Sequence, residues 1–154
     1  MNYWLMKSEP DVFGIDHLKS RPKKTEPWDG VRNYQARNMM RDEMKKGDLC
    51  FFYHSNCDVP GIVGIMEVVR EGYPDHTAFD PEEHYYDPKS DPEKPRWYMV
   101  DVKYKRQLKR NISLKELKEF ADTTLADCPL VRKGNRLSIM PISHQQWEFI
   151  LSLE

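Results

Sequence analysis

The side chains that could carry out catalysis are few, and their spacing forms no catalytic motif. His54 and Ser55 look like a base beside a nucleophile, but neighbouring residues of a strand point to opposite faces of a sheet and cannot pair directly. The stretch Gly61–Gly64 lacks the lysine and the helix that a phosphate-binding loop needs. Lys7 and Glu9 could exchange a proton, although an ion pair at a strand end is the commoner use of such residues. We therefore expect a protein that is not an enzyme.

A metal site is not expected either. His76 and His84 stand among several carboxylates in an acidic stretch, but their spacing matches no recurrent set of metal ligands. Five prolines within residues 72–95 make this stretch a long surface loop. The three cysteines contain no C-x-x-C pair and are odd in number. We expect no metal, no cofactor and no disulfide framework.

A planar ligand, in contrast, has a candidate site at Trp28. This residue precedes Gly30 in a loop, directly before a helix that is expected to start after Asn33. Free backbone N–H groups at a helix start are donors, and stacking of a base on an aromatic ring contributes about 1 to 3 kcal/mol. The Asn33 amide can both donate to and accept from a base edge. An alternative stays open, in which Trp28 is a core residue and Asn33 only a helix cap.

The net charge of −1 hides an uneven distribution. Residues 19–46 carry nine basic and four acidic side chains, a net of +5. Residues 71–93 carry one basic and eight acidic side chains, a net of −7, and residues 102–118 return to +6 with seven basic and one acidic. These segments are either solvated faces or a surface for an anionic ligand, and charge alone does not decide between them.

The length of 154 residues fits one domain, residues 1–154, that can bury a core without a metal or disulfides. With 39% hydrophobic and 32% charged residues the chain is too balanced to be a disordered tail. The longest apolar run, Leu49–Tyr53, is too short to cross a membrane, and the first residues do not form a signal peptide. We expect no membrane association and a reducing compartment, the cytoplasm or, in a eukaryotic cell, the nucleus.

Periodicity and capping signals predict an α+β fold with a curved sheet or a small barrel. Helices are expected near residues 15–18 and after Asn33, and S-x-x-E/Q capping boxes mark two more helix starts at Ser113 and Ser143. Residues 20–27 read as a polar linker. Strands are predicted at residues 2–7, 49–54, 61–69, 97–104 and 136–140.

Six short stretches carry a resemblance to a known family: Trp4–Pro10, Trp28–Asn38, Phe52–Ser55, Tyr85–Pro88, Pro95–Trp97 and Arg136–Ser138. In this order and with this spacing they closely resemble the EVE domain family, over essentially the whole chain. The resemblance implies a PUA-like fold, a curved and mostly antiparallel β-barrel of about five to six strands with peripheral helices.

The EVE family is in turn similar to YTH domains, which bind a methylated base in an aromatic cage. The resemblance implies that this chain recognises a modified nucleobase in single-stranded RNA or DNA, with Trp28 as one wall and Asn33 reading the base edge. The second wall stays open between Tyr85, Tyr86 and Trp97. Arg32, Arg37 and Arg41 are expected near the phosphates. The full set of implied ligand-binding residues is Lys7, Ser8, Trp28, Asn33, Tyr34, Tyr53, His54, Ser55, Tyr85 and Trp97.

Two alternatives from other functional classes remain. One is an enzyme or enzyme partner acting on a nucleotide-like small molecule, with Lys7, Glu9, His54 or Ser55 in the chemistry. The other is a protein-interaction domain whose acidic loop docks a basic partner, because a fold does not fix a function. The absence of net positive charge argues against tight, sequence-independent nucleic-acid binding. The sequence makes no prediction of oligomeric state.

Overall fold

The computed structural model describes all residues, 1–154, and contains one six-stranded sheet in the order β2-β5-β4-β3-β1-β6. Four of the five strand pairs are antiparallel, and only β1 and β3 run parallel. This confirms the α+β class and a mostly antiparallel, six-stranded sheet. The strands are β1 (Tyr3–Ser8), β2 (Thr25–Pro27), β3 (Leu49–His54), β4 (Gly61–Pro74), β5 (Tyr98–Ser113) and β6 (Ile139–Ile142).

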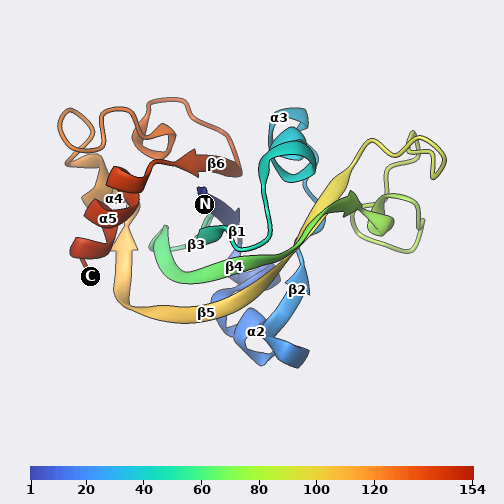
Figure 1. Cartoon of the computed structure of the whole chain (residues 1–154), viewed down its shortest axis with the longest axis horizontal. Coiled ribbons are helices and arrows are strands. Elements are labelled where there is room, and N and C mark those ends of the chain that lie inside the picture. Colours follow the sequence, from blue (N-terminus) through green and yellow to red (C-terminus); the bar gives the residue numbers. More distant parts are fainter.

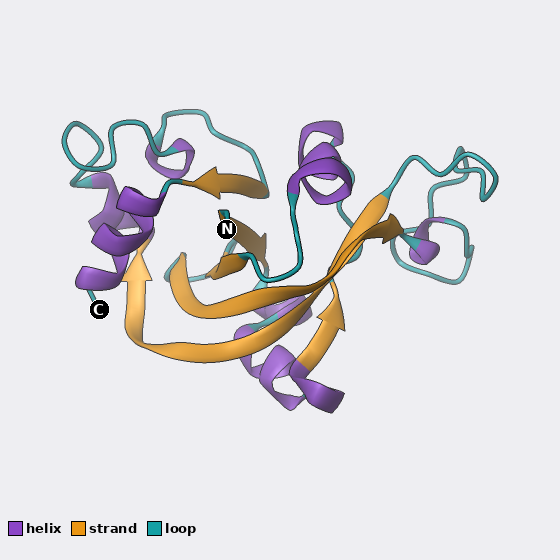
Figure 2. Ribbon diagram, viewed as in Figure 1, coloured by secondary structure: helices purple, strands orange, loops and turns teal.

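The sheet does not close into a barrel, so this part of the expectation was wrong. Closure requires the two outer strands, β2 and β6, to pair with each other, and they do not. They have only three and four residues, and Figure 1 shows them on opposite sides of the sheet. The curvature itself is confirmed: β4 and β5 sweep around the core as one bent ribbon (Figure 2). Four register shifts between these two strands provide the bending.

The helices begin where the capping signals place them. The Asn33 side chain accepts from the Ala36 N–H at the start of α3, and Ser143 forms both bonds of a capping box with Gln146 at the start of α5. Ser113 caps α4, but the Glu116 carboxylate binds Arg110 instead of returning to the cap, so this box is half formed. The helices are α1 (Pro10–Phe13), α2 (Ile15–Ser20), α3 (Tyr34–Asn38), α4 (Leu114–Lys118) and α5 (His144–Ser152).

Hydrophobic side chains form two buried clusters, to which β1 contributes alternating residues. Trp4 and Met6 join the cluster that contains Trp28. Leu5 joins the other, which contains Phe51 and the helix α5. Burial of each such side chain stabilises the fold by about 1.5 to 3 kcal/mol. Both faces of β1 are therefore buried, and its carboxyl end is consequently held in a fixed position.

Two segments differ from the sequence-based expectation. The linker at residues 20–27 contains a short 3-10 turn and the strand β2, which pairs with β5 over three residues. The loop expected at residues 72–95 spans residues 75–97 instead, because β4 continues to Pro74, and it contains a 3-10 turn at His76–Ala78.

None of the helices combines the length and the hydropathy needed to cross a membrane. The three cysteines are unpaired.

Candidate binding pocket

A cavity of about 420 Å³ opens at the carboxyl end of β1. Two backbone hydrogen bonds assemble one side of it: the Lys7 N–H donates to the Ser138 carbonyl at 2.8 Å, and the Ser55 N–H donates to the Ser8 carbonyl at 3.0 Å. These bonds join the ends of β1 and β3 to the segment before β6. The opposite side comes from residues 26–32, between β2 and α3, and from the loop between β4 and β5.

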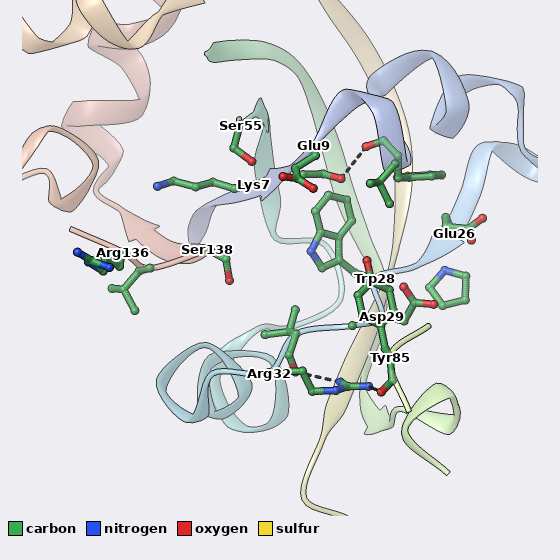
Figure 3. Close-up of a pocket in the computed structure, with 17 residues that line it drawn as sticks. Lys7, Glu9, Glu26, Trp28, Asp29, Arg32, Ser55, Tyr85, Arg136 and Ser138 are labelled. Carbon is green, nitrogen blue, oxygen red and sulfur yellow. Dashed lines mark hydrogen bonds between the residues drawn. The ribbon is translucent and has the colours of Figure 1, made fainter. Parts of the chain in front are cut away.

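The indole of Trp28 lies in the middle of the residues that line the cavity (Figure 3). Only 6% of the residue is exposed, and its ring meets Phe52 and Phe13 edge-on at centroid distances of 5.4 and 6.3 Å. Its backbone N–H donates to the Val100 carbonyl. The two readings of Trp28 therefore do not exclude each other, because the same side chain belongs to the core and lines the cavity.

Tyr85 reaches the cavity from the long loop and lies against Gly30. The backbone of Gly30 has φ +78°, a conformation that other residues rarely adopt, and a Cβ atom there would lie 2.5 Å from the tyrosine ring. Only glycine permits this approach. The close approach to Gly30 places the ring of Tyr85 near Asp29, the preceding residue, in the cavity wall.

A buried network ties the long loop to the pocket. The Asp75 carboxylate is fully buried and accepts from the Gly30 N–H at 2.9 Å, from Arg32 Nη1 at 3.0 Å and from both the N–H and the hydroxyl of Thr77. The Arg32 Nη2 donates to the Tyr85 carbonyl at 2.6 Å. Burial alone would raise the pKa of Asp75, but these hydrogen bonds outweigh it and lower the pKa.

Charged side chains are separated across the cavity. Figure 3 shows Lys7 and Arg136 on one side of Trp28, with Glu26 and Asp29 on the other. Neither Lys7 nor Arg136 makes a side-chain hydrogen bond or an ion pair, and burial lowers the pKa of Lys7. Glu9 is the exception, because it lies beside Lys7 (Figure 3), where its carboxylate accepts from Asn56. Apart from Glu9, the cavity has a basic side and an acidic side. This arrangement can orient a ligand that carries donors at one edge and acceptors at another.

The Asp29 carboxyl in the cavity has a pKa well above its ordinary value. Its pKa is raised to about 6, first by burial and then by the negative charges of Asp75, Glu26 and Glu83, while His76 acts in the opposite direction. Unlike Asp75, Asp29 has no hydrogen-bond or ion-pair partner in the protein, so no direct contact compensates the burial of its charge.

The structure brings together six of the residues named from the sequence. Ser8 and Ser55 present hydroxyl groups, and the Ser8 hydroxyl donates to the Phe13 carbonyl. Arg32 was expected at a phosphate, whereas its guanidinium is occupied by Asp75 and Tyr85. The six residues in the cavity lining are Lys7, Ser8, Trp28, Arg32, Ser55 and Tyr85.

Three further residues named from the sequence have roles within the fold and do not line the cavity. The amide oxygen of Asn33 caps α3. Tyr53 is 2% exposed, and burial raises its pKa to about 12. His54 Nε2 accepts from the Ile15 N–H at 3.1 Å at the start of α2, and burial lowers the pKa of this imidazole.

The remaining four lie together outside the cavity, around α3. Tyr34 is exposed and stacks on Trp97 at 4.8 Å, and the indole N–H of Trp97 donates to the carboxylate of Asp87. Arg37 lies over the Tyr34 ring and donates to the Arg96 carbonyl. Arg41 pairs with its neighbour Asp42 at the exposed surface.

Several lining residues were not named from the sequence. Asp29, Gly30, Val31 and Arg136–Ser138 belong to the stretches that resemble the EVE family, so the signal was present. Glu9 was considered only for proton exchange. No pattern in the sequence pointed to the others, which come from α1 and from the segment before Trp28: Val12, Phe13, Glu26 and Pro27.

Comparison with known proteins agrees with this architecture. Thymocyte nuclear protein 1 of Mus musculus is 48% identical over 99% of this chain and 74% of its own length, and that of Danio rerio is 49% identical over 98% and 71%. The crystal structure of human THYN1 protein in complex with 5-methylcytosine containing DNA superposes with a TM-score of 0.91 at 48% identity, covering 99% of this chain and 97% of that one.

A crystal structure of a Pseudomonas syringae protein superposes with a TM-score of 0.92 at 49% identity, covering 98% of both chains. The family profile described as EVE domain matches residues 2–153. The resemblance noted in the sequence is therefore confirmed by family, relatives and fold alike. This chain belongs to the EVE domain family.

Proposed function

We propose that this protein binds DNA that contains 5-methylcytosine and holds the modified base in the cavity around Trp28. The observation that carries the proposal is the cavity itself, which at about 420 Å³ falls in the range of small-molecule sites and combines an indole with hydroxyl and charged groups. The relation to human THYN1, whose structure contains 5-methylcytosine DNA, supports the choice of base and of DNA over RNA.

A base inside a duplex cannot reach such a cavity, so the target nucleotide is single-stranded or flipped out of the stack. Trp28 and Tyr85 supply aromatic surface, on which stacking contributes about 1 to 3 kcal/mol. Val12, Phe13 and Leu137 supply apolar surface for a methyl group. Affinity then comes mainly from one base, which suits a chain with a net charge of −1.

Phosphate contacts are proposed at the basic side of the cavity. Lys7 and Arg136 have free side-chain donors, whereas Arg32 is occupied by Asp75. Arg37 and Arg41 lie around α3, outside the cavity lining. A strand that passes over Lys7 and Arg136 would deliver its base into the cavity between them and Trp28.

The proposed role is binding without catalysis. The Ser55 hydroxyl lines the cavity, but the base next to it in sequence is unavailable, because His54 Nε2 accepts from a backbone N–H. We also propose a reducing compartment, which the three unpaired cysteines support. Where the cell has a nucleus, the name of the relatives and the proposed DNA ligand favour that location over the cytoplasm.

The test is a titration with labelled oligonucleotides that differ in one base, 5-methylcytosine or cytosine, offered as single-stranded DNA, duplex DNA and RNA. We expect the methylated DNA to bind at least tenfold more tightly than its unmodified counterpart, as measured by fluorescence anisotropy. Equal affinities for the two bases, or no binding by protein shown to be folded, would overturn the proposal. Tighter binding to RNA than to DNA would show that the protein recognises the modified base in RNA.

Variants locate the base. Trp28→Leu keeps an apolar side chain in the core but removes the stacking face, and we expect at least a tenfold loss of affinity with the fold retained by circular dichroism. Trp97→Leu removes the aromatic stack outside the cavity, and we expect it to retain binding. The reverse result would move the base to the Tyr34–Trp97 stack.

A further inference from the structure

Three carboxylates line the cavity, and they differ in what they bind. Glu26 pairs with Arg21 at 2.8 Å, and Glu9 accepts from the side-chain amide of Asn56. Asp29 accepts no hydrogen bond from the protein, although it lies next to Trp28 in the cavity wall. A half-buried carboxylate without a donor is unfavourable unless a ligand supplies one.

We infer that Asp29 selects bases that carry an exocyclic amine, so that the cavity accepts cytosine-type bases and rejects thymine and uracil. This inference rests on the proposed function and names the residue that sets its specificity. Carboxylates accept from the N4 amine of cytosine in protein–nucleic acid complexes. Thymine presents the O4 acceptor at the same position, and two acceptors facing each other in a half-buried site repel.

The opposite side of the cavity adds to the same selection. Lys7 and Arg136 are donors without protein acceptors, and they face Asp29 across Trp28 (Figure 3). A cytosine ring has an amine at one end of its base-pairing edge and the O2 carbonyl at the other, so it can give a donor to the acidic side and an acceptor to the basic side. Thymine has a carbonyl at both ends of this edge, and its single donor, the N3–H, lies in the middle, so neither end can give a donor to the acidic side.

The groups around Asp29 make this selection depend on pH. Asp75, Glu26 and Glu83 surround it with negative charge, His76 opposes them, and Tyr85 is the neutral group from the long loop. The pKa of Asp29 is about 6. The carboxylate therefore accepts from an amine above pH 6, whereas below pH 6 the protonated carboxyl donates to a carbonyl. Preference for the amine should fall as the pH falls through this value.

The test uses two bases that differ in the group at position 4, an amine or a carbonyl, and with it in the hydrogen on the adjacent N3. Thymine is 5-methyluracil, so 5-methylcytosine and thymine in the same oligonucleotide share the ring and the methyl group. We expect the wild-type protein to prefer 5-methylcytosine at least tenfold at pH 7.5, and to prefer it less than threefold at pH 5. Asp29→Asn has an amide that can donate to O4, and we expect less than threefold preference at both pH values.

Asp122→Asn is the matched control, because it removes one negative charge from an exposed position away from the cavity. The control should retain the wild-type preference for 5-methylcytosine and its pH dependence. Asp29→Glu, which keeps a carboxylate, should show a preference between those of Asp29→Asn and the wild-type protein. If wild-type protein binds 5-methylcytosine and thymine equally, or if Asp29→Asn keeps the full preference, the inference is overturned while the proposed function stands.

Failure of folded wild-type protein to bind 5-methylcytosine DNA at all would overturn both the proposed function and the inference. If Asp29→Asn does not fold, the pH series on the wild-type protein decides, since a preference that is constant between pH 5 and 7.5 contradicts the role of Asp29.

Discussion

The ring of Tyr85 rests on Gly30 so closely that no methyl group fits between them: a Cβ at position 30 would lie 2.5 Å from Tyr85 Cε2. The contact joins two segments more than fifty residues apart in the sequence. The Tyr85 ring can take this position in the cavity because Gly30, the residue it faces, has no side chain. Gly30 is therefore required for two reasons, its positive φ and this approach.

Gly30→Ala should destabilise the protein and weaken binding of 5-methylcytosine DNA, because the new methyl group displaces Tyr85. Gly47→Ala is the matched control, since Gly47 also has a positive φ but nothing lies within 4 Å of its missing Cβ. Backbone strain alone costs about 1 kcal/mol or somewhat more, and we expect Gly30→Ala to exceed the control by at least about 1 kcal/mol in urea unfolding. Equal losses of unfolding free energy in the two variants would show that the Tyr85 ring moves aside without an energetic cost.

Asp75→Asn should reduce the free energy of unfolding by about 3 kcal/mol, because it leaves Arg32 without its buried counter-charge. The comparison is Asp42→Asn, which breaks a fully exposed pair with Arg41 and should leave the free energy of unfolding almost unchanged. Chemical denaturation measures both. A cost for Asp75→Asn no larger than that of the exposed pair would contradict the structural role of this network.

The buried pair of Asp75 and Arg32 also predicts that the stability of the protein decreases in acid. The folded-state pKa of Asp75 lies below its ordinary value, so its ionised form contributes stability above about pH 4, and this contribution is lost as the pH falls further. The stability gap between wild-type protein and Asp75→Asn should therefore narrow between pH 5 and pH 3. A gap that stays constant over that range would exclude Asp75 as the titrating group.

Asp29→Asn should have the opposite effect and stabilise the protein at pH 7.5. The pKa of Asp29 is raised to about 6, so its ionised form is unfavourable in the folded state. After discounting for the exposed part of the side chain, we expect a gain of about 1 kcal/mol. The gain should shrink as the pH falls from 7 to 4, because the folded wild-type carboxyl is then protonated. A loss of stability at pH 7.5 would show that Asp29 has a structural partner.

Binding should depend on salt through the residues at the basic side of the cavity. Lys7→Gln and Arg136→Gln should each reduce the slope of log affinity against log salt by about 0.7 to 0.9, the change expected for one phosphate contact. Arg41→Gln, on the exposed surface outside the cavity, is the comparison and should leave the slope unchanged. A slope that changes only in Arg41→Gln would place the nucleic-acid backbone along α3.

Local signals in the sequence were enough for much of the fold. Ser143 and Gln146 determine a helix start through two hydrogen bonds between neighbouring residues, and the apolar residues on both faces of β1 report its burial. The strand β5 is longer than expected, because Lys103–Arg110 is rich in charge and shows no apolar face. The strand β2 was missed because its three residues include a proline and gain their stability from pairing with β5.

The pocket was only partly predictable, since its residues meet through tertiary contacts. Trp28 stood out as a large ring beside glycine, and the family resemblance pointed to Lys7 and Tyr85. The isolation of Asp29 could not be seen in the sequence, because it depends on Glu26 having Arg21 as a partner and on Asp75 having Arg32. Which carboxylate lacks a partner is a property of the folded chain alone.

The open sheet leaves two edge strands, and both are short and contain proline: Pro27 in β2 and Pro141 in β6. Proline has no N–H to offer to an incoming strand, and a brief edge gives a foreign chain little to pair with. The sheet can therefore stay open, with two free edges, without offering a strand on which other chains could aggregate. Replacing Pro141, which does not line the cavity, would remove a safeguard against fibril-like association and leave the ligand site unchanged, whereas Pro27 also belongs to the cavity lining.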